Sequence, residues 1–261
     1  MHKNFQIKMR MTRFILLMLL LYSGALFSQD NNTQLWEKAN AFYTTEDYPQ
    51  AISLYEQILS SGQESAKLYF NLGNAYYKAG NMNNALLNFE RAKLLSPNDE
   101  NIDFNIKIAN QFVVTSIEPL PLPFFMRWRT SVINMYSSDT WSYISISAFV
   151  LFLILIGLFI FSRIVTIRRI SFLFGIFVLI LSGFTYSFAA KQKKKIDLRS
   201  GAIVFCPRVT VKSAPTATST DLFLIYEGLK VEITDSIGTW KEIKLADGNE
   251  GWLQDSCIVK I

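Results

Sequence analysis

Two uncharged apolar runs constrain the fold of this chain more than any other feature. Residues 141–162 contain no charged side chain, and neither do residues 170–190. At about 1.5 Å per residue, a helix over either run spans the roughly 30 Å hydrocarbon core of a bilayer. Only residues 163–169 separate the two runs, so we predict a transmembrane helical hairpin with a short loop. A hairpin buried in a soluble core is the alternative, and two such lengths side by side argue against it.

Residues 1–28 have the organisation of a secretory signal. A basic region without acidic residues is followed by an apolar stretch over residues 14–21 and by small residues before Gln29. The basic residues are Lys3, Lys8, Arg10 and Arg13. We predict a signal peptide over residues 1–28, and an uncleaved anchor is the alternative.

The number of membrane crossings predicts where the soluble parts lie. An export signal, cleaved or not, delivers the chain outside the cytoplasm, and two further spans return it to that side. Both soluble segments are therefore expected outside the cytoplasm, with the loop 163–169 inside it. The three arginines of this loop agree with the positive-inside rule. The lysines of residues 191–195 do not, and we interpret them as contacts for anionic lipid headgroups.

Residues 32–99 contain an internal repeat, in which 66–99 is a second copy of 32–65. The second unit, 66–99, resembles the tetratricopeptide repeat at all eight signature positions. These positions hold Tyr69, Leu72, Gly73, Tyr76, Ala85, Phe89, Ala92 and Pro97, with tyrosine in place of the usual tryptophan at the first. The first unit, 32–65, is a weaker copy, and a third unit near Glu100 has one credible helix. We therefore expect an all-α array over 32–113 that consists of two repeats and a capping helix.

The tetratricopeptide resemblance implies that an extended peptide binds along the concave face formed by the first helix of each repeat. The implied groove residues are Trp36, Asn40, Tyr43, Lys67, Phe70, Asn71, Asn74 and Tyr77. The asparagines suit hydrogen bonds to a peptide backbone, and the aromatic residues suit anchoring contacts. Packing inside the repeats is the alternative for each aromatic residue. The basic residues of a carboxylate clamp are absent at Trp36, Asn101 and Asn105, which argues against capture of a C-terminal carboxylate.

Residues 114–140 form an approach to the membrane. The segment 118–123 alternates proline with other residues, so it is expected to be extended rather than helical. The aromatic residues and arginines of 124–129 predict a short interfacial helix. We interpret 114–140 as a proline linker followed by that helix.

Residues 201–261 change to short β-rich runs separated by turns, and five or six strands fit a small all-β barrel. The region resembles bacterial SH3-like domains in residues 211–215, in residues 227–231 and in the pair Gly251-Trp252. Such domains bind peptidoglycan or short peptides, which implies a ligand-stacking face formed by Tyr226, Trp240 and Trp252. Core packing is the alternative for all three, and it is favoured for Trp252.

Two cysteines, Cys206 and Cys257, lie near the ends of this β region. Terminal strands of a small barrel are often neighbours, and a compartment outside the cytoplasm permits disulfides. A Cys206–Cys257 disulfide and two buried thiols are both compatible with the sequence.

Composition argues against an enzyme. The single histidine is His2, which removes histidine-based nucleophilic schemes and histidine-bearing zinc sites, and two cysteines are too few for a Cys₄ site. We expect no metal and no cofactor. The net charge of +5 does not indicate a nucleic-acid partner either. Residues 1–28 and 114–200 carry the basic excess, whereas acidic residues outnumber basic ones in 29–113 and 201–261.

Over essentially its whole length the chain resembles the tetratricopeptide member (BatE type) of the Bacteroides aerotolerance operon. The stretches 117–121 and 138–141, just before the first span, add to this resemblance. It implies a multidomain inner-membrane scaffold with periplasmic domains, linked to tolerance of oxygen or envelope stress. The implied partners are von Willebrand factor A-type membrane proteins and a MoxR-type ATPase. A module that binds peptidoglycan through the SH3-like domain is the alternative.

Overall fold

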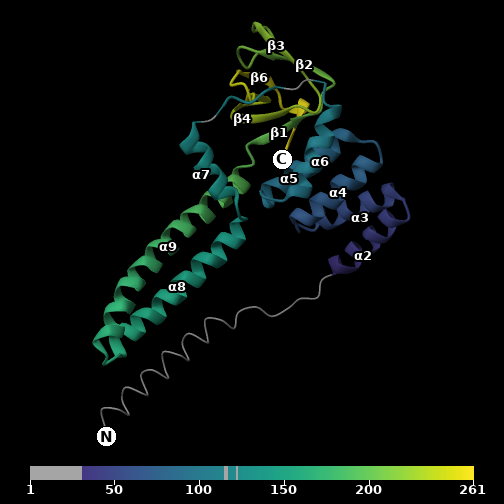
Figure 1. The fold of residues 1–261 in the computed structure, drawn as a ribbon. Coiled ribbons are helices and arrows are strands. Elements are labelled where there is room, and N and C mark those ends of the chain that lie inside the picture. The colour runs from purple at the N-terminus through teal and green to yellow at the C-terminus, as the bar shows by residue number, and fades with distance from the viewer. Residues whose placement is uncertain (1–30, 115–116, 122) are drawn as a thin grey trace. The chain divides into compact units, whose positions relative to one another are not determined.

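The computed structural model describes residues 31–114, 117–121 and 123–261, so the predicted signal peptide lies outside the described residues. The chain divides into two compact units. One includes residues 144–184, and the other combines residues 34–143 with 185–261. The helical repeats and the C-terminal strands therefore belong to the same unit. Figure 1 labels the helices and strands along the chain.

The repeats consist of paired α-helices, and their ends recur with the period of the sequence. The helices are α2 (Asn31–Thr44), α3 (Tyr48–Ser60), α4 (Ala66–Lys78), α5 (Met82–Leu95) and α6 (Glu100–Ala109), which the short 3₁₀ helix η1 (Asn110–Phe112) follows. Asp47 and Asn81, at equivalent positions of the two repeats, cap α3 and α5 by accepting a backbone N–H of the first turn. Ser65 and Asp99 cap α4 and α6 in the same way.

Small residues let the repeat helices approach closely. Ala39, Ala51 and Ala85 are fully buried between helices. A Cβ atom added to Gly73 would lie 2.6 Å from the Phe89 ring, so glycine is needed for α4 and α5 to pack at this distance.

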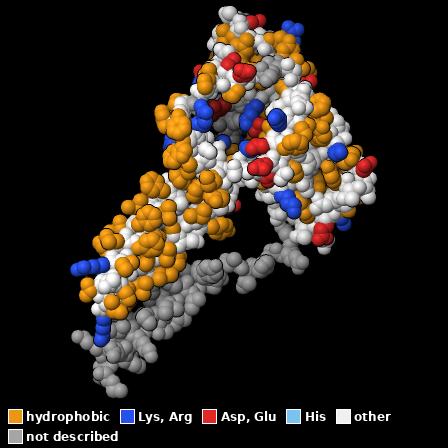
Figure 2. Space-filling model, in the orientation of Figure 1, with side chains coloured by type: hydrophobic (Ala, Val, Ile, Leu, Met, Phe, Trp, Pro, Cys, Tyr) orange, Lys and Arg blue, Asp and Glu red, His pale blue; other side chains and the backbone are white. Residues whose placement is uncertain are grey.

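Three further helices follow: α7 (Phe124–Asn134), α8 (Ser138–Phe161) and α9 (Val165–Leu198). Helices α8 and α9 are long and apolar enough to cross a membrane. Their large side chains, such as Ile154 and Phe177, are exposed, unlike those of a helix in a soluble core (Figure 2). Helix α9 continues beyond Ala190 through the lysine cluster because no glycine or proline interrupts it before Gly201. It also begins at Val165, inside the expected loop 163–169, so Arg168 and Arg169 lie in its first turns.

Within the unit that includes residues 144–184, α8 and α9 are joined by polar and aromatic contacts. The Ser145 and Ser182 hydroxyls each donate to the other residue's backbone carbonyl at 3.0 Å. The rings of Phe159 and Phe172 lie 5.5 Å apart. These contacts hold the two helices together as a hairpin.

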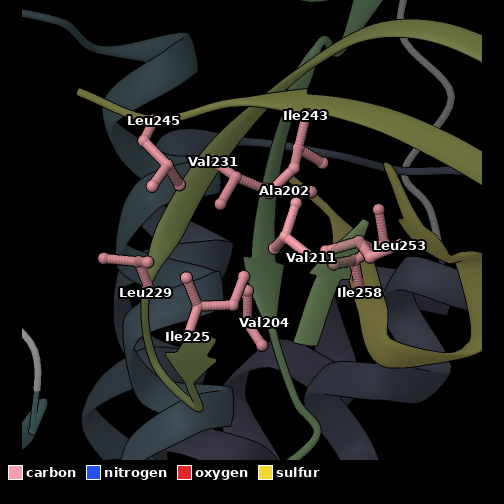
Figure 3. Packing of buried hydrophobic residues seen from close by; sticks show 10 residues of the cluster. All are labelled: Ala202, Val204, Val211, Ile225, Leu229, Val231, Ile243, Leu245, Leu253 and Ile258. Atoms are coloured by element: carbon pink, nitrogen blue, oxygen red, sulfur yellow. The ribbon is translucent and has the colours of Figure 1, made fainter. Parts of the chain in front are cut away.

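The C-terminal β domain is one antiparallel sheet that surrounds a single core. Its strands are β1 (Gly201–Val204), β2 (Arg208–Lys212), β3 (Asp221–Tyr226), β4 (Lys230–Ile237), β5 (Trp240–Lys244), β6 (Glu250–Gln254) and β7 (Ile258–Lys260). The order across the sheet is β3-β2-β6-β5-β4-β1-β7. Every strand contributes a buried apolar side chain to the same cluster, and Figure 3 shows these side chains converging. A disulfide joins Cys206 and Cys257, whose Cα atoms are 4.9 Å apart.

The linker after the repeats lies against the β domain. A Cβ atom added to Gly228 would come within 2.9 Å of Val113, which shows how closely the chain passes. Ile117 packs against the β-domain core, and the Leu120 backbone N–H donates to the Ala246 carbonyl at 3.0 Å. Residues 117–121 form no helix and are attached to the β domain.

The β domain also packs against α5. Ile203 of β1 and the C-terminal Ile261 share a hydrophobic cluster with Leu86 and Leu87 of α5. Polar contacts surround the cluster. They are the hydrogen bond from Asn83 to Glu227 at 2.8 Å, that from Arg91 to the Lys260 carbonyl at 2.7 Å, and the ion pair between Glu90 and Lys230. Repeats and β domain therefore form one composite body.

Candidate partner-binding face

The candidate site lies on the first helix of each repeat, α2, α4 and α6. Counting by one repeat length gives sets of equivalent positions on these helices, which together we call the first-helix face. The sets are Trp36, Phe70 and Phe104; Asn40 and Asn74; Asn71 and Asn105; and Tyr43 and Tyr77. Because repeats stack with a regular offset, equivalent residues follow one another from helix to helix.

Asparagine amides join neighbouring first helices through the same hydrogen bond twice. Asn71 Nδ2 donates to Asn40 Oδ1 at 3.1 Å, and Asn105 Nδ2 donates to Asn74 Oδ1 at 2.7 Å. The buried Tyr55 hydroxyl also donates to Asn40 Oδ1, at 2.7 Å. Among the described residues, Asn74 Nδ2 and Asn105 Oδ1 make no hydrogen bond, and both side chains are half-buried, so one donor and one acceptor remain available.

An aromatic stripe runs beside the asparagines. The Trp36 ring meets Tyr55 edge-on at 5.7 Å, and Lys67 Nζ lies 5.5 Å from the Trp36 ring centroid. The Phe70 ring is half-buried, 6.0 Å from a ring of α5. Phe104, at the equivalent position on α6, is 64 % exposed. The stripe thus becomes more exposed toward the end of the array.

Tyr43 and Tyr77 are also used inside the array. Tyr43 lies edge-on to Tyr48 at 5.6 Å, and Tyr77 lies edge-on to Phe112 at 6.4 Å. Burial raises the pKa of the Tyr43 hydroxyl above its ordinary value, so it is a neutral donor at physiological pH. Only the exposed parts of these half-buried rings are left for a partner.

Two residues of this face, Phe104 and Asn105, are not among the predicted groove residues, where Asn105 entered only as a position without a clamp base. Both lie on α6, which the sequence indicates only as a cap. The signal was available, since Phe104 follows Phe70 by one repeat length and Asn105 follows Asn71 by the same interval.

The three aromatic residues proposed for the β domain lie on the sheet face opposite its core. Leu253 belongs to the core, so its neighbour Trp252 is directed to the other face, where it pairs across strands with Lys212 and Glu242. Trp252 is nevertheless buried, whereas Tyr226 and Trp240 are half-buried. Within the described residues no two of these three rings contact each other, so they do not form one stacked cluster.

The described part of the chain contains no candidate metal-binding site. No group of three or more histidine, cysteine, aspartate or glutamate side chains is placed there to hold an ion.

Comparison with known proteins identifies the repeat. Residues 66–99 match the tetratricopeptide repeat family. This segment comprises α4, α5 and the turn after them. A comparison with curated proteins finds no match to the chain. The repeat family indicates that this region mediates contact with other proteins.

Proposed function

We propose that this chain is a non-enzymatic membrane adaptor whose first-helix face binds an extended segment of a partner protein. The observation that carries the proposal is the repeated asparagine pair beside the aromatic stripe. Amide groups without a partner among the described residues, such as Asn74 Nδ2, suit hydrogen bonds to a peptide main chain, and exposed rings, such as Phe104, supply anchors. The tetratricopeptide match at residues 66–99 supports the same function.

Site-specific photocrosslinking tests the proposal. A photoreactive residue in place of Phe104 should capture a partner protein in living cells. The matched control is the same residue in place of Gln57, which is exposed on α3, the second helix of its repeat. We expect a crosslinked band at position 104 and none at position 57. Equal capture at both positions, or capture at neither, contradicts the proposal.

The resemblance to BatE-type proteins supplies the partner class for this proposal. We propose a von Willebrand factor A-type membrane protein in a complex linked to aerotolerance or envelope stress. Purification of the full chain in mild detergent, followed by mass spectrometry, should recover such a protein from wild-type cells. Its recovery should fall when Phe104 and Asn105 are both replaced by alanine. Unchanged recovery would place the contact elsewhere on the chain.

We also propose that the repeats and the β domain, whose strand pattern resembles SH3-like domains, lie in the periplasm. Two observations support this placement: the Cys206–Cys257 disulfide suits an oxidising compartment, and three arginines lie between the two apolar runs. A membrane-impermeant maleimide should label Thr218→Cys in intact cells. It should label Ile164→Cys, between α8 and α9, only after the cells are permeabilised. The reverse labelling pattern would show that the repeats and the β domain lie in the cytoplasm.

A further inference from the structure

Helix α7 carries an exposed aromatic face that the partner-binding proposal does not use. Phe124, Phe125 and Trp128 are 80 %, 65 % and 64 % exposed. At 3.6 residues per turn these three side chains fall within an arc of about 100°. Arg127 and Arg129 border the arc on its two sides. Figure 2 shows hydrophobic and basic side chains gathered over this helix.

The opposite end of α7 is fixed by hydrogen bonds. The Trp141 indole Nε1 donates to the Ile133 carbonyl at 2.9 Å. The Gln192 amide Nε2 donates to the same carbonyl at 3.0 Å and to Asn134 Oδ1 at 3.1 Å. Gln192 is buried in this arrangement. Two side chains from different helices therefore hold the last turn of α7.

The two residues that hold α7, Trp141 and Gln192, lie at the ends of the apolar runs. Trp141 is the first residue of the run in α8, and Gln192 follows the end of the run in α9 by two residues. The Trp141 ring packs on Phe188 at 5.1 Å, and Ser138 Oγ donates to the Ala189 carbonyl at 3.2 Å. The end of α7 is thus tied to the place where both apolar runs stop. For membrane-spanning helices that place is the boundary between hydrocarbon and headgroups.

We propose that α7 is an interfacial anchor that inserts Phe124, Phe125 and Trp128 into an anionic lipid surface. The proposal rests on the membrane placement of α8 and α9. Three aromatic residues with arginines on both sides suit the boundary, because the rings enter the acyl region and the guanidinium groups remain at the phosphates. Lys191 and Lys194, exposed on α9 next to Gln192, add positive charge at the same level. Charge complementarity therefore favours anionic over zwitterionic lipid.

Spin labelling of the full chain in lipid nanodiscs tests this proposal. Both native cysteines are joined in the disulfide, so a single added cysteine is labelled selectively. The label at Phe125→Cys probes the aromatic face, and the label at Thr130→Cys is the matched control, exposed on the opposite side of α7. Collisions with oxygen report lipid, and collisions with a water-soluble nickel chelate report water. A third label, at Ile154→Cys, reports whether α8 itself is in lipid.

In nanodiscs that contain phosphatidylglycerol, we expect the label at 125 to collide with oxygen and to be protected from the chelate. The label at 130 should remain accessible to the chelate. Discs of phosphatidylcholine alone should protect position 125 less. The double variant Arg127→Gln/Arg129→Gln, with its fold checked by circular dichroism, should bind the anionic surface less strongly. We expect the extra protection of position 125 from the chelate in anionic discs, relative to phosphatidylcholine discs, to fall on the order of tenfold.

Three results would overturn the proposal, and they differ from one another. Chelate access at position 125 equal to that at 130, with position 154 in lipid, shows that α7 lies in water while the membrane placement stands. Protection of position 125 from both oxygen and chelate shows that protein covers α7. A label at position 154 that is not in lipid shows that the membrane placement is wrong, and the interfacial role of α7 is then wrong as well.

Discussion

Glu46 and Gly80 occupy equivalent positions, one repeat length apart, just after the first helix of each repeat. Both have positive φ, 61° for Glu46 and 80° for Gly80. This conformation costs a residue with a Cβ roughly 1–2 kcal/mol, and a carboxylate near a helix C-terminus is also unfavourable. Glu46→Gly should therefore raise the free energy of unfolding by about 0.5–1 kcal/mol, measured by chemical denaturation of the full chain in detergent. Glu37→Gly, in the middle of α2, should lower it by about 1 kcal/mol. A loss of stability for Glu46→Gly would contradict this explanation.

The Asn40 amide is the residue on which the first asparagine pair depends. Its Oδ1 accepts from both Asn71 and the Tyr55 hydroxyl, and Tyr55 is fully buried. Burial raises the pKa of Tyr55, so the hydroxyl cannot ionise at neutral pH to relieve a missing acceptor. Asn40→Ala should lower the free energy of unfolding by about 1–3 kcal/mol, because the buried Tyr55 hydroxyl and the half-buried Asn71 amide lose their acceptor. Asn74→Ala, where one such bond is lost, should cost less.

A double-mutant comparison separates this effect from general packing. Tyr55→Phe removes the buried donor, so the further loss caused by Asn40→Ala should be smaller in the Tyr55→Phe background than in the wild type. If Asn40→Ala lowers the free energy of unfolding equally in both backgrounds, the hydrogen bond between Tyr55 and Asn40 does not stabilise the fold.

At the scale of elements, the disulfide stabilises the closure of the β domain. Cys206 follows β1, Cys257 precedes β7, and their sequence separation is 51. The Phe205 backbone N–H also donates to the Cys257 carbonyl at 2.8 Å, so the terminal strands are paired beside the cross-link. Replacing both cysteines by serine should lower the stability of the β domain by about 2–4 kcal/mol, because the unfolded chain gains freedom. A thermal melt of the oxidised wild type and the variant measures the loss, and unchanged melting would contradict it.

The sequence predicted elements whose pattern is local and missed those that depend on distant partners. The repeat period and the tetratricopeptide signature indicated the repeat helices, and two uncharged runs indicated α8 and α9. Strand alternation indicated the β domain, although one more strand is present than the largest number expected. The packing of the β domain on α5 had no local signal, because Asn83 and Glu90 look like ordinary polar positions of a helix. Their partners, Glu227 and Lys230, lie at least 140 residues further along the chain.

At the scale of the whole molecule, the contact between α5 and the β domain couples two modules that look separate in the sequence. Glu90 is 8 % exposed and pairs with Lys230 beside the apolar cluster that contains Ile203 and Ile261. This ion pair is half open to solvent on the lysine side, so its contribution is well below that of a fully buried pair. The pair nevertheless favours the packed arrangement of the two modules, because Glu90 would be buried without a partner if Lys230 were absent.

Charge reversal at this pair should separate the two modules. Glu90→Lys places two ammonium groups together, and Lys230→Glu places two carboxylates together, so each should lower the free energy of unfolding by roughly 1–3 kcal/mol. Hydrogen exchange should accelerate at the amides of β1, where α5 no longer covers them, while α2 and α3 remain protected. The double variant Glu90→Lys/Lys230→Glu restores opposite charges and should recover most of the loss. If the double variant is as unstable as the sum of the single ones, the ion pair does not couple the modules, and the apolar cluster alone must hold them together.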